Sequence, residues 1–319
     1  MKLKVYFILI PLSLLSYACR ENNGIVNNTA STHGGIYTEV GGNISGTLNL
    51  KDSPFLIISD IIISENDTLI IEAGVTLFFE ERRRLIADGI ILANGTSQKR
   101  IIFTSFLTSW KGISITNPTD TSKFKFCIIQ EVFQQNDDTI KNGAIEISSS
   151  KVVIENSVFR MNNTIYGGGL FASNSRAIIK NNIFIYNDAA VFGGAMFLDN
   201  STADIINNTV YRNSCFNFGG GIVLWEPLST NMQNNIIYNN FSFTGDNRIA
   251  IVSGDSSNIN EQYNYLAFGE MDPMFISGEN LHLSSGSPSI NNGNPDPLYN
   301  DVDGTRNDQG AFGGPLGNW

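Results

Sequence analysis

The feature that most constrains this chain is a repeat in its central part, with a period near 26. Short segments that begin with asparagine return with spacings of 26, 26 and 27, at Asn156, Asn182, Asn208 and Asn235. Glycine runs lie between them and recur with spacings of 26 and 26, beginning at Gly167, Gly193 and Gly219. Two markers with one period indicate a repeat architecture, in which each unit packs on its neighbours.

Each unit contains short β-rich segments, such as residues 151–154 and 203–206, separated by Asn, Asp, Ser and Gly. No apolar spacing of 3.6 is long enough for a helix, so the pattern predicts strands and turns. A period near 26 accommodates a coil of three strands and three turns, and stacked coils place their strands in parallel about 4.8 Å apart. We therefore predict an all-β parallel solenoid with apolar columns inside, one of them Val158, Phe184, Val210 and either Ile236 or Ile237.

The two markers have structural explanations. Asparagine tolerates left-handed turns, and its amide can bond the equivalent amide one coil above and below. Glycine allows a positive φ or a close backbone approach. A phosphate-binding loop is the alternative for the glycine runs, but no helix and no Lys-Ser/Thr pair follow them, so we favour the structural interpretation.

Further segments carry a resemblance to a known family. Residues 67–77 resemble a first coil, as do 93–96, 101–105 and 110–113, and the C-terminal blocks are 272–275, 281–283, 287–293, 301–306 and 308–312. Together with the repeat, they resemble the right-handed parallel β-helix superfamily that includes the pectate-lyase-like proteins. The resemblance implies a right-handed parallel β-helix over residues 40–270, with about eight coils. It also implies that residues 271–319 cap the last coil, because an open end would expose a sheet edge. Where relatives end with an aromatic residue and an acid after Gly-Ala, this chain has Phe312-Gly313.

The first residues are typical of a bacterial export signal. A lysine-containing start precedes an apolar stretch at residues 6–15 that is too short to span a membrane. Ala18-Cys19 resembles a lipobox, although Ser16 occupies the position usually held by leucine. We expect a signal peptide at 1–18, lipidation of Cys19 and a tether at 19–39, hence anchoring to the cell envelope, at the outer membrane. An ordinary secretory signal is the alternative.

The net charge bears on the class of binding partner, and the cysteine content bears on disulfide bonding. The formal net charge of −10 argues against nucleic acid, whose phosphates need clustered positive charge. With Cys19 lipidated, Cys127 and Cys215 remain, and they would lie several coils apart. We therefore predict no disulfide, and a buried free thiol at Cys127.

Two outward columns are candidate ligand surfaces. The spacing of 26 predicts that Arg160, Tyr186 and Arg212 lie above one another, where charge and ring stacking could hold an anionic sugar chain. A second column consists of Asn174, Asn200 and Glu226, with Trp225 beside Glu226. The alternative is that both columns are only solvated surface.

The remaining candidates concern metal and catalysis. Asp301, Asp303 and Asp308 resemble a short Ca²⁺ loop, although turn-forming aspartates explain them equally well. Many β-helix relatives cleave acidic polysaccharides, but this sequence has no recognisable acid pair, and its two histidines lie outside the coils. We therefore predict a non-catalytic scaffold that binds or displays a ligand such as glycan. The alternative is a polysaccharide lyase or glycoside hydrolase using Arg160 or Arg212, so the sequence leaves enzyme activity open.

Overall fold

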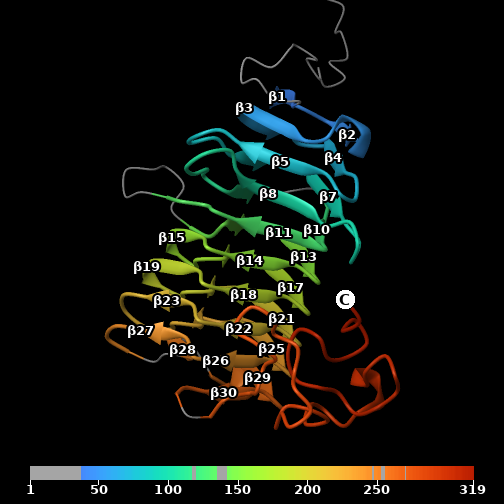
Figure 1. The fold of residues 1–319 in the computed structure, drawn as a ribbon. Helices are drawn as coiled ribbons and strands as arrows, with labels where there is room; N and C mark the ends of the chain where they lie inside the picture. The colour runs from blue at the N-terminus through green and yellow to red at the C-terminus, as the bar shows by residue number, and fades with distance from the viewer. Residues whose placement is uncertain (1–36, 117–119, 135–141, 246–247, 253–255, 270) are drawn as a thin grey trace, which may run out of the picture.

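The computed structural model describes residues 37–116, 120–134, 142–245, 248–252, 256–269 and 271–319. Over these ranges the chain winds into a parallel β-helix, which confirms the predicted architecture (Figure 1). Three long parallel faces run the length of the stack, and a small sheet lies between two of them. Short 3-10 helices occur at Leu50–Asp52, Ser256–Asn258 and Pro297–Tyr299.

Face 1 is a nine-stranded parallel sheet. Its strands are β2 (Gly46–Leu48), β4 (Thr68–Ile71), β7 (Ile90–Asn94), β10 (Ser122–Lys125), β13 (Lys151–Glu155), β17 (Arg176–Lys180), β21 (Thr202–Ile206), β25 (Ser229–Gln233) and β29 (Ile259–Gln262). Nine stacked strands enclose eight full turns of the chain, in agreement with the predicted number of coils.

Faces 2 and 3 form one further sheet because β3 pairs with the next strand of each. Face 2 contains β1 (Thr38–Asn43), β3 (Phe55–Ile63), β5 (Thr76–Phe79), β8 (Ile101–Ser105), β11 (Cys127–Gln130), β14 (Val158–Arg160), β18 (Ile183–Ile185), β22 (Thr209–Tyr211), β26 (Ile236–Tyr238) and β30 (Tyr265–Ala267). Face 3 contains β6 (Leu85–Ala87), β9 (Ile113–Thr116), β12 (Ile145–Ser148), β16 (Leu170–Ser173), β20 (Met196–Asp199), β24 (Ile222–Trp225) and β28 (Ile249–Val252).

The small sheet follows face 2 in the later coils and consists of β15 (Asn163–Tyr166), β19 (Asp188–Phe192), β23 (Ser214–Cys215) and β27 (Phe241–Ser242). We name the turns of a coil by the faces that they join. Turn A leads from face 1 to face 2, turn B leads from face 2 towards face 3, and turn C leads from face 3 back to face 1.

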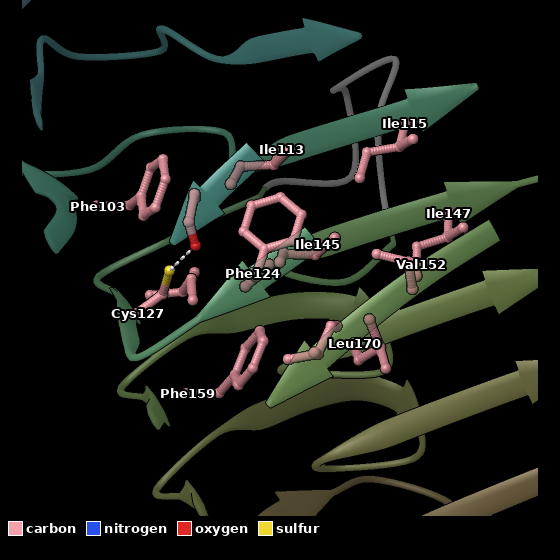
Figure 2. Packing of buried hydrophobic residues seen from close by; sticks show 14 of the residues in the cluster. Phe103, Ile113, Ile115, Phe124, Cys127, Ile145, Ile147, Val152, Phe159 and Leu170 are labelled. Carbon is pink, nitrogen blue, oxygen red and sulfur yellow. Dashed lines mark hydrogen bonds between the residues drawn. The ribbon is translucent and has the colours of Figure 1, made fainter. Parts of the chain in front are cut away.

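The interior is filled by apolar side chains from all three faces (Figure 2). One inward column is Phe159, Phe184, Val210 and Ile237, whose strands pair in that register and whose side chains are fully buried. The prediction for this column was therefore wrong at its first position, because Val158 lies on the outer side of β14. Cys127 is a free thiol in this core, as predicted, and its Sγ lies 3.5 Å from the Ala93 carbonyl oxygen.

The asparagine ladder exists, but its register differs by one position from the predicted one. It runs through Asn182, Asn208, Asn235 and Asn264, and each backbone N–H donates to the Oδ1 of the next member at 2.8–2.9 Å. Ser157, not Asn156, precedes Asn182, and its N–H donates to Asn182 Oδ1. Asn-Asn pairs stand at this turn in later coils, so an alignment by asparagine alone can slip by one position.

A β-bulge explains why the equivalent asparagine positions of two successive coils are 25 residues apart, whereas the glycine runs are 26 residues apart. Thr164 pairs with Ala189 at a sequence separation of 25, whereas Tyr166 pairs with Phe192 at a separation of 26. The extra residue lies in β19, after the asparagines and before the glycines. Positions before the bulge therefore follow the shorter of the two periods in this pair of coils.

A second ladder, which the sequence analysis missed, occupies turn B. Its members Asn162, Asn187, Asn213 and Asn240 are buried, and Nδ2 of each donates to Oδ1 of the next. Their Nδ2 groups also donate to a carbonyl of the preceding coil, as in Asn213 to Phe184 at 2.9 Å. Buried amides at both turns are thus satisfied within the stack.

The glycine runs have the structural role that was predicted. Gly193 has φ +69°, in the left-handed region. A Cβ on Gly194 would lie 2.2 Å from the carbonyl oxygen of Gly220 in the next coil. Close packing of successive coils therefore requires glycine here.

Residues 271–319 form a strap along the side of the stack (red in Figure 1). They pack on the outer surface of face 2, where a second apolar cluster contains Ile183, Ile185, Tyr211, Ile236, Tyr238, Leu281 and Ala311. These contacts differ from the expected cap on the last coil. The outward apolar side chains of face 2 favour this arrangement, because the strap removes them from water.

The strap is bonded through a column of asparagines in turn A that have positive φ. The Nδ2 group of Asn156 donates to Leu316 O, that of Asn181 to Gly313 O, and that of Asn207 to Asp308 O, while Oδ1 of Asn234 accepts from Asn294 N. At the end of the strap, the Trp319 ring lies 4.6 Å from the Arg100 guanidinium carbon.

Candidate functional site

Turn B presents a column of outward residues with left-handed backbone, Glu131, Met161, Tyr186, Arg212 and Asn239. Tyr186 and Arg212 therefore share a column, as predicted. Arg160 does not belong to it, because Arg160 pairs with Ile185 in the sheet and Met161 occupies the position above Tyr186. The cause is the shorter interval that the bulge in β19 leaves before turn B.

Tyr186 and Arg212 form one unit on the surface. Arg212 Nη1 donates to the Tyr186 hydroxyl at 2.8 Å, and the guanidinium carbon lies 4.8 Å from the centre of the Tyr211 ring. The hydrogen bond from Arg212 to Tyr186 is the main cause that raises the pKa of Arg212, so the guanidinium stays charged. Tyr186 is 40% exposed, and Arg212 is exposed as well. Arg160 instead donates from Nε to Gln130 Oε1 at 2.7 Å.

A pocket of about 400 Å³ opens at the N-terminal end of the same turn-B column. Its lining includes Glu131 and Met161 from that column and Phe133 just beyond it. No signal in the repeat pointed to this pocket, because it depends on residues 81 and 108–109 that precede the regular coils.

The second predicted column is confirmed in turn C. Asn174, Asn200 and Glu226 all have positive φ, and Asn200 Nδ2 donates to Asn174 Oδ1 at 2.6 Å. Trp225 lies at the end of face 3, where its ring is 6.2 Å from those of Phe192 and Phe197. Trp225 and Glu226 therefore belong to a different surface from Tyr186 and Arg212, since face 3 separates turn B from turn C.

The outer surface of face 3 carries an aromatic cluster that sequence reasoning did not single out. It contains Tyr166, Phe171, Phe192, Phe197, Phe218, Val223 and Trp225. The rings stack along the stack axis, for example Phe171 on Phe197 with centroids 5.5 Å apart. Because neighbouring rings cover one another's faces, we assign this cluster to coil packing.

Two carboxyl groups on face 3 have raised pKa values. Burial raises the pKa of Glu146, which accepts from Asn142 Nδ2 at 3.2 Å. Burial also raises the pKa of Asp199, with the charge of Glu226 adding to the effect. Such shifts favour the protonated acid that general acid catalysis uses.

The three aspartates of the strap line one pocket, of about 540 Å³. Their oxygens accept bonds from nearby groups: Asp301 from the N–H groups of Asp308 and Gly314, Asp303 from Thr305, and Asp308 from Asn291. Within the described parts of the chain, no group of three or more His, Cys, Asp or Glu is placed to hold a metal ion. Calcium binding here stays a prediction from sequence.

The predicted lipidation site, Cys19, lies outside the residues that the structure describes. In the described part of the chain, no helix has the length and apolar character needed to cross a membrane.

The stacked parallel faces, with asparagine ladders at two turns, define the protein as a parallel β-helix. Residues 88–264 match the family described as "right handed beta helix region". This match covers more than half of the 319 residues, so the chain belongs to that family. Comparison with curated proteins and with solved structures gives no significant match.

Proposed function

We propose that this protein is an exported lipoprotein, anchored to the cell envelope through Cys19, whose β-helix binds glycan without cleaving it. The observation that carries the binding role is the exposed Tyr186–Arg212 pair. One Arg212 N–H bonds Tyr186, and the remaining donors of the guanidinium suit a carboxylate on a sugar ring. Tyr186, 40% exposed, offers a ring on which a sugar can pack.

The arrangement supports recognition of an acidic glycan at one position per ligand, not along a continuous arginine ladder. Arg160 lies outside the column, and Met161 stands in its place. A single charge-assisted contact with one ring gives modest affinity, which suits display or retention of a polymer that binds repeatedly along its length.

A hydrolase is the second candidate, favoured by Glu146 and Asp199. Both lie on face 3, on strands β12 and β20, with β16 between them. Two steps of about 4.8 Å separate these strands. The two carboxyl groups would need to approach to roughly 5–9.5 Å to act on one glycosidic bond. A lyase based on Arg160 or Arg212 stays a prediction from sequence.

The test uses the mature protein without lipid, incubated with acidic and neutral polysaccharides. Retention on the protein, new reducing ends and unsaturated products are measured together. We expect retention of an acidic glycan without product, and a loss of at least fivefold in Arg212→Ala. Arg176→Ala is the matched control, because Arg176 is an exposed arginine on face 1 that pairs with Asp204. New reducing ends that Glu146→Gln abolishes would instead establish the hydrolase.

Anchoring is tested separately by expressing the full chain and its Cys19→Ser variant in a bacterium. The proposal expects the parent chain in the membrane fraction, carrying labelled fatty acid, and the variant without label. Equal labelling of both would contradict it.

A further inference from the structure

The pocket at the N-terminal end of turn B combines apolar and hydrogen-bonding side chains in a built site. Phe133 and Met161 are 41% and 58% exposed. The lining also contains Thr108, Ser109 and two carboxylates, Glu81 and Glu131. The volume of about 400 Å³ lies in the range of small-ligand sites, about 300–1,000 Å³.

The backbone that carries these side chains is fixed by the coil beneath it. Phe133 N–H donates to Trp110 O at 3.0 Å, and Lys111 Nζ donates to Phe133 O at 2.9 Å. The Trp110 side chain is fully buried and stacks on Phe79, with ring centroids 4.2 Å apart. The Phe133 ring is therefore held exposed on an ordered support, which lowers the cost of ordering on binding.

One carboxylate is also oriented in advance. Glu131 Oε2 accepts from Thr104 Oγ1 at 2.6 Å and from Ser105 Oγ at 2.8 Å. Among the contacts of the described residues, Glu131 Oε1 has none, so it is free to accept from a ligand. A carboxylate oxygen that accepts from a hydroxyl forms a charge-assisted bond, stronger than a neutral one.

The charges of the pocket select the class of ligand. Its lining includes Glu81 and Glu131 but no Lys, Arg or His among the described residues. Two carboxylates in the lining disfavour an anionic ligand, because the Lys111 ammonium below them is already bonded to Phe133 O. A hydroxyl-rich molecule with an apolar face fits both the carboxylates and the exposed Phe133 ring.

We propose that this pocket is a second binding site, which takes an uncharged sugar of one or two units through stacking on Phe133 and hydroxyl bonds to Glu131. It is independent of the Tyr186–Arg212 pair, whose guanidinium suits an acidic sugar. The protein would therefore hold neutral and acidic sugars at different positions of turn B.

The experiment measures binding of short, uncharged cello-, xylo- and manno-oligosaccharides to the mature chain by calorimetry, with chitosan oligosaccharides as the cationic comparison. We expect at least one neutral oligosaccharide to bind. Phe133→Ala should weaken it at least tenfold, and Glu131→Gln at least threefold. The control Phe216→Ala removes another exposed phenylalanine, 57% exposed on the small-sheet side, and should leave binding unchanged.

Three outcomes would overturn the assignment: no binding of any neutral oligosaccharide, equal binding by Phe133→Ala, or binding of the chitosan series alone. Loss of binding on chelation of Ca²⁺ would also overturn it, because the carboxylates would then be metal ligands. Arg212→Ala separates the two proposals, since it should weaken acidic glycan only. Circular dichroism of each variant verifies that the β-helix has folded.

Discussion

Replacing Asn208 by alanine is the sharpest test of how the ladder in turn A stabilises the stack. Asn208 Oδ1 accepts from the backbone N–H of Asn182 at 2.9 Å, and Asn208 Nδ2 donates to Ile179 O at 2.8 Å and to Asn235 Oδ1 at 3.0 Å. Asn208 is fully buried. Alanine would thus leave a buried N–H unpaired and remove these two donations of Nδ2. It would also remove two longer contacts that add little, from Asn182 Nδ2 at 3.1 Å and to Ile206 O at 3.2 Å.

The expected cost follows from these contacts. A buried donor left unsatisfied costs about 1–3 kcal/mol, and each further bond contributes about 1 kcal/mol. We therefore expect Asn208→Ala to lower the free energy of unfolding by about 3–5 kcal/mol. For a chain of this size the melting temperature should fall by roughly 10 °C.

The chain itself supplies the matched variant. Ser157 occupies the equivalent ladder position one coil before Asn182, and its Oγ accepts from Cys127 N–H at 3.0 Å. Asn208→Ser should therefore keep an acceptor for the Asn182 N–H and cost about half as much as alanine. Thermal unfolding followed by circular dichroism gives both values. A loss below about 1 kcal/mol for alanine, or equal losses for the two variants, would refute the reasoning.

Three further predictions concern the strap and the thiols. Asn207→Gly keeps the left-handed turn but removes the bonds to the strap, so hydrogen exchange of 307–313 should accelerate at least tenfold, whereas Asn200→Gly in turn C should leave it unchanged. Burial raises the pKa of Cys215 to about 11. Ellman's reagent at pH 8 should therefore label neither Cys215 nor Cys127 until the protein is unfolded. Rapid labelling of the native protein would contradict this. Burial also raises the pKa of Asp301. The stability that this carboxyl contributes is therefore fully present below its unfolded pKa of about 3.9 and is lost as pH rises through its folded pKa. The melting temperature of Asp301→Asn should rise relative to that of the parent protein from pH 4 to pH 7, and a constant difference would contradict the shift.

The sequence was sufficient for the architecture because strand, turn and repeat signals agreed with one another. The glycine spacing of 26 marks equivalent positions of successive coils, because each glycine must be small where the coils approach closely. A Cβ at Gly194, for example, would collide with the next coil. The asparagine spacing was off by one position at its first step, because Asn156 corresponds to Asn181 of the next coil and Ser157, not Asn156, corresponds to Asn182. A one-position shift of this kind reverses which side chains face inward, as Val158 illustrates.

The candidate site was predictable only in part, for the same reason. The extra residue of β19 lies between Tyr186 and Arg212, which are therefore 26 residues apart and in register. The preceding interval is only 25 residues, so Met161 aligns with Tyr186 and Arg160 lies one position outside the column. The Phe133 pocket could not be predicted, because part of its wall comes from residues 81 and 108–109, which lie in loops without a repeat. The strap was recognisable as a segment, but its path depends on long-range bonds such as Asn207 to Asp308, which no local pattern encodes.

The strap also constrains the number of coils that it can span. It reaches Asn234 through Asn294 and Asn156 through Leu316, contacts that are three coils apart on the solenoid. Repeat proteins usually gain or lose whole units with little consequence, because each unit contacts only its neighbours. Here an inserted coil would lengthen that distance by about 4.8 Å, and Trp319 would no longer reach Arg100. The contacts of the strap therefore fix how many coils this part of the protein can have.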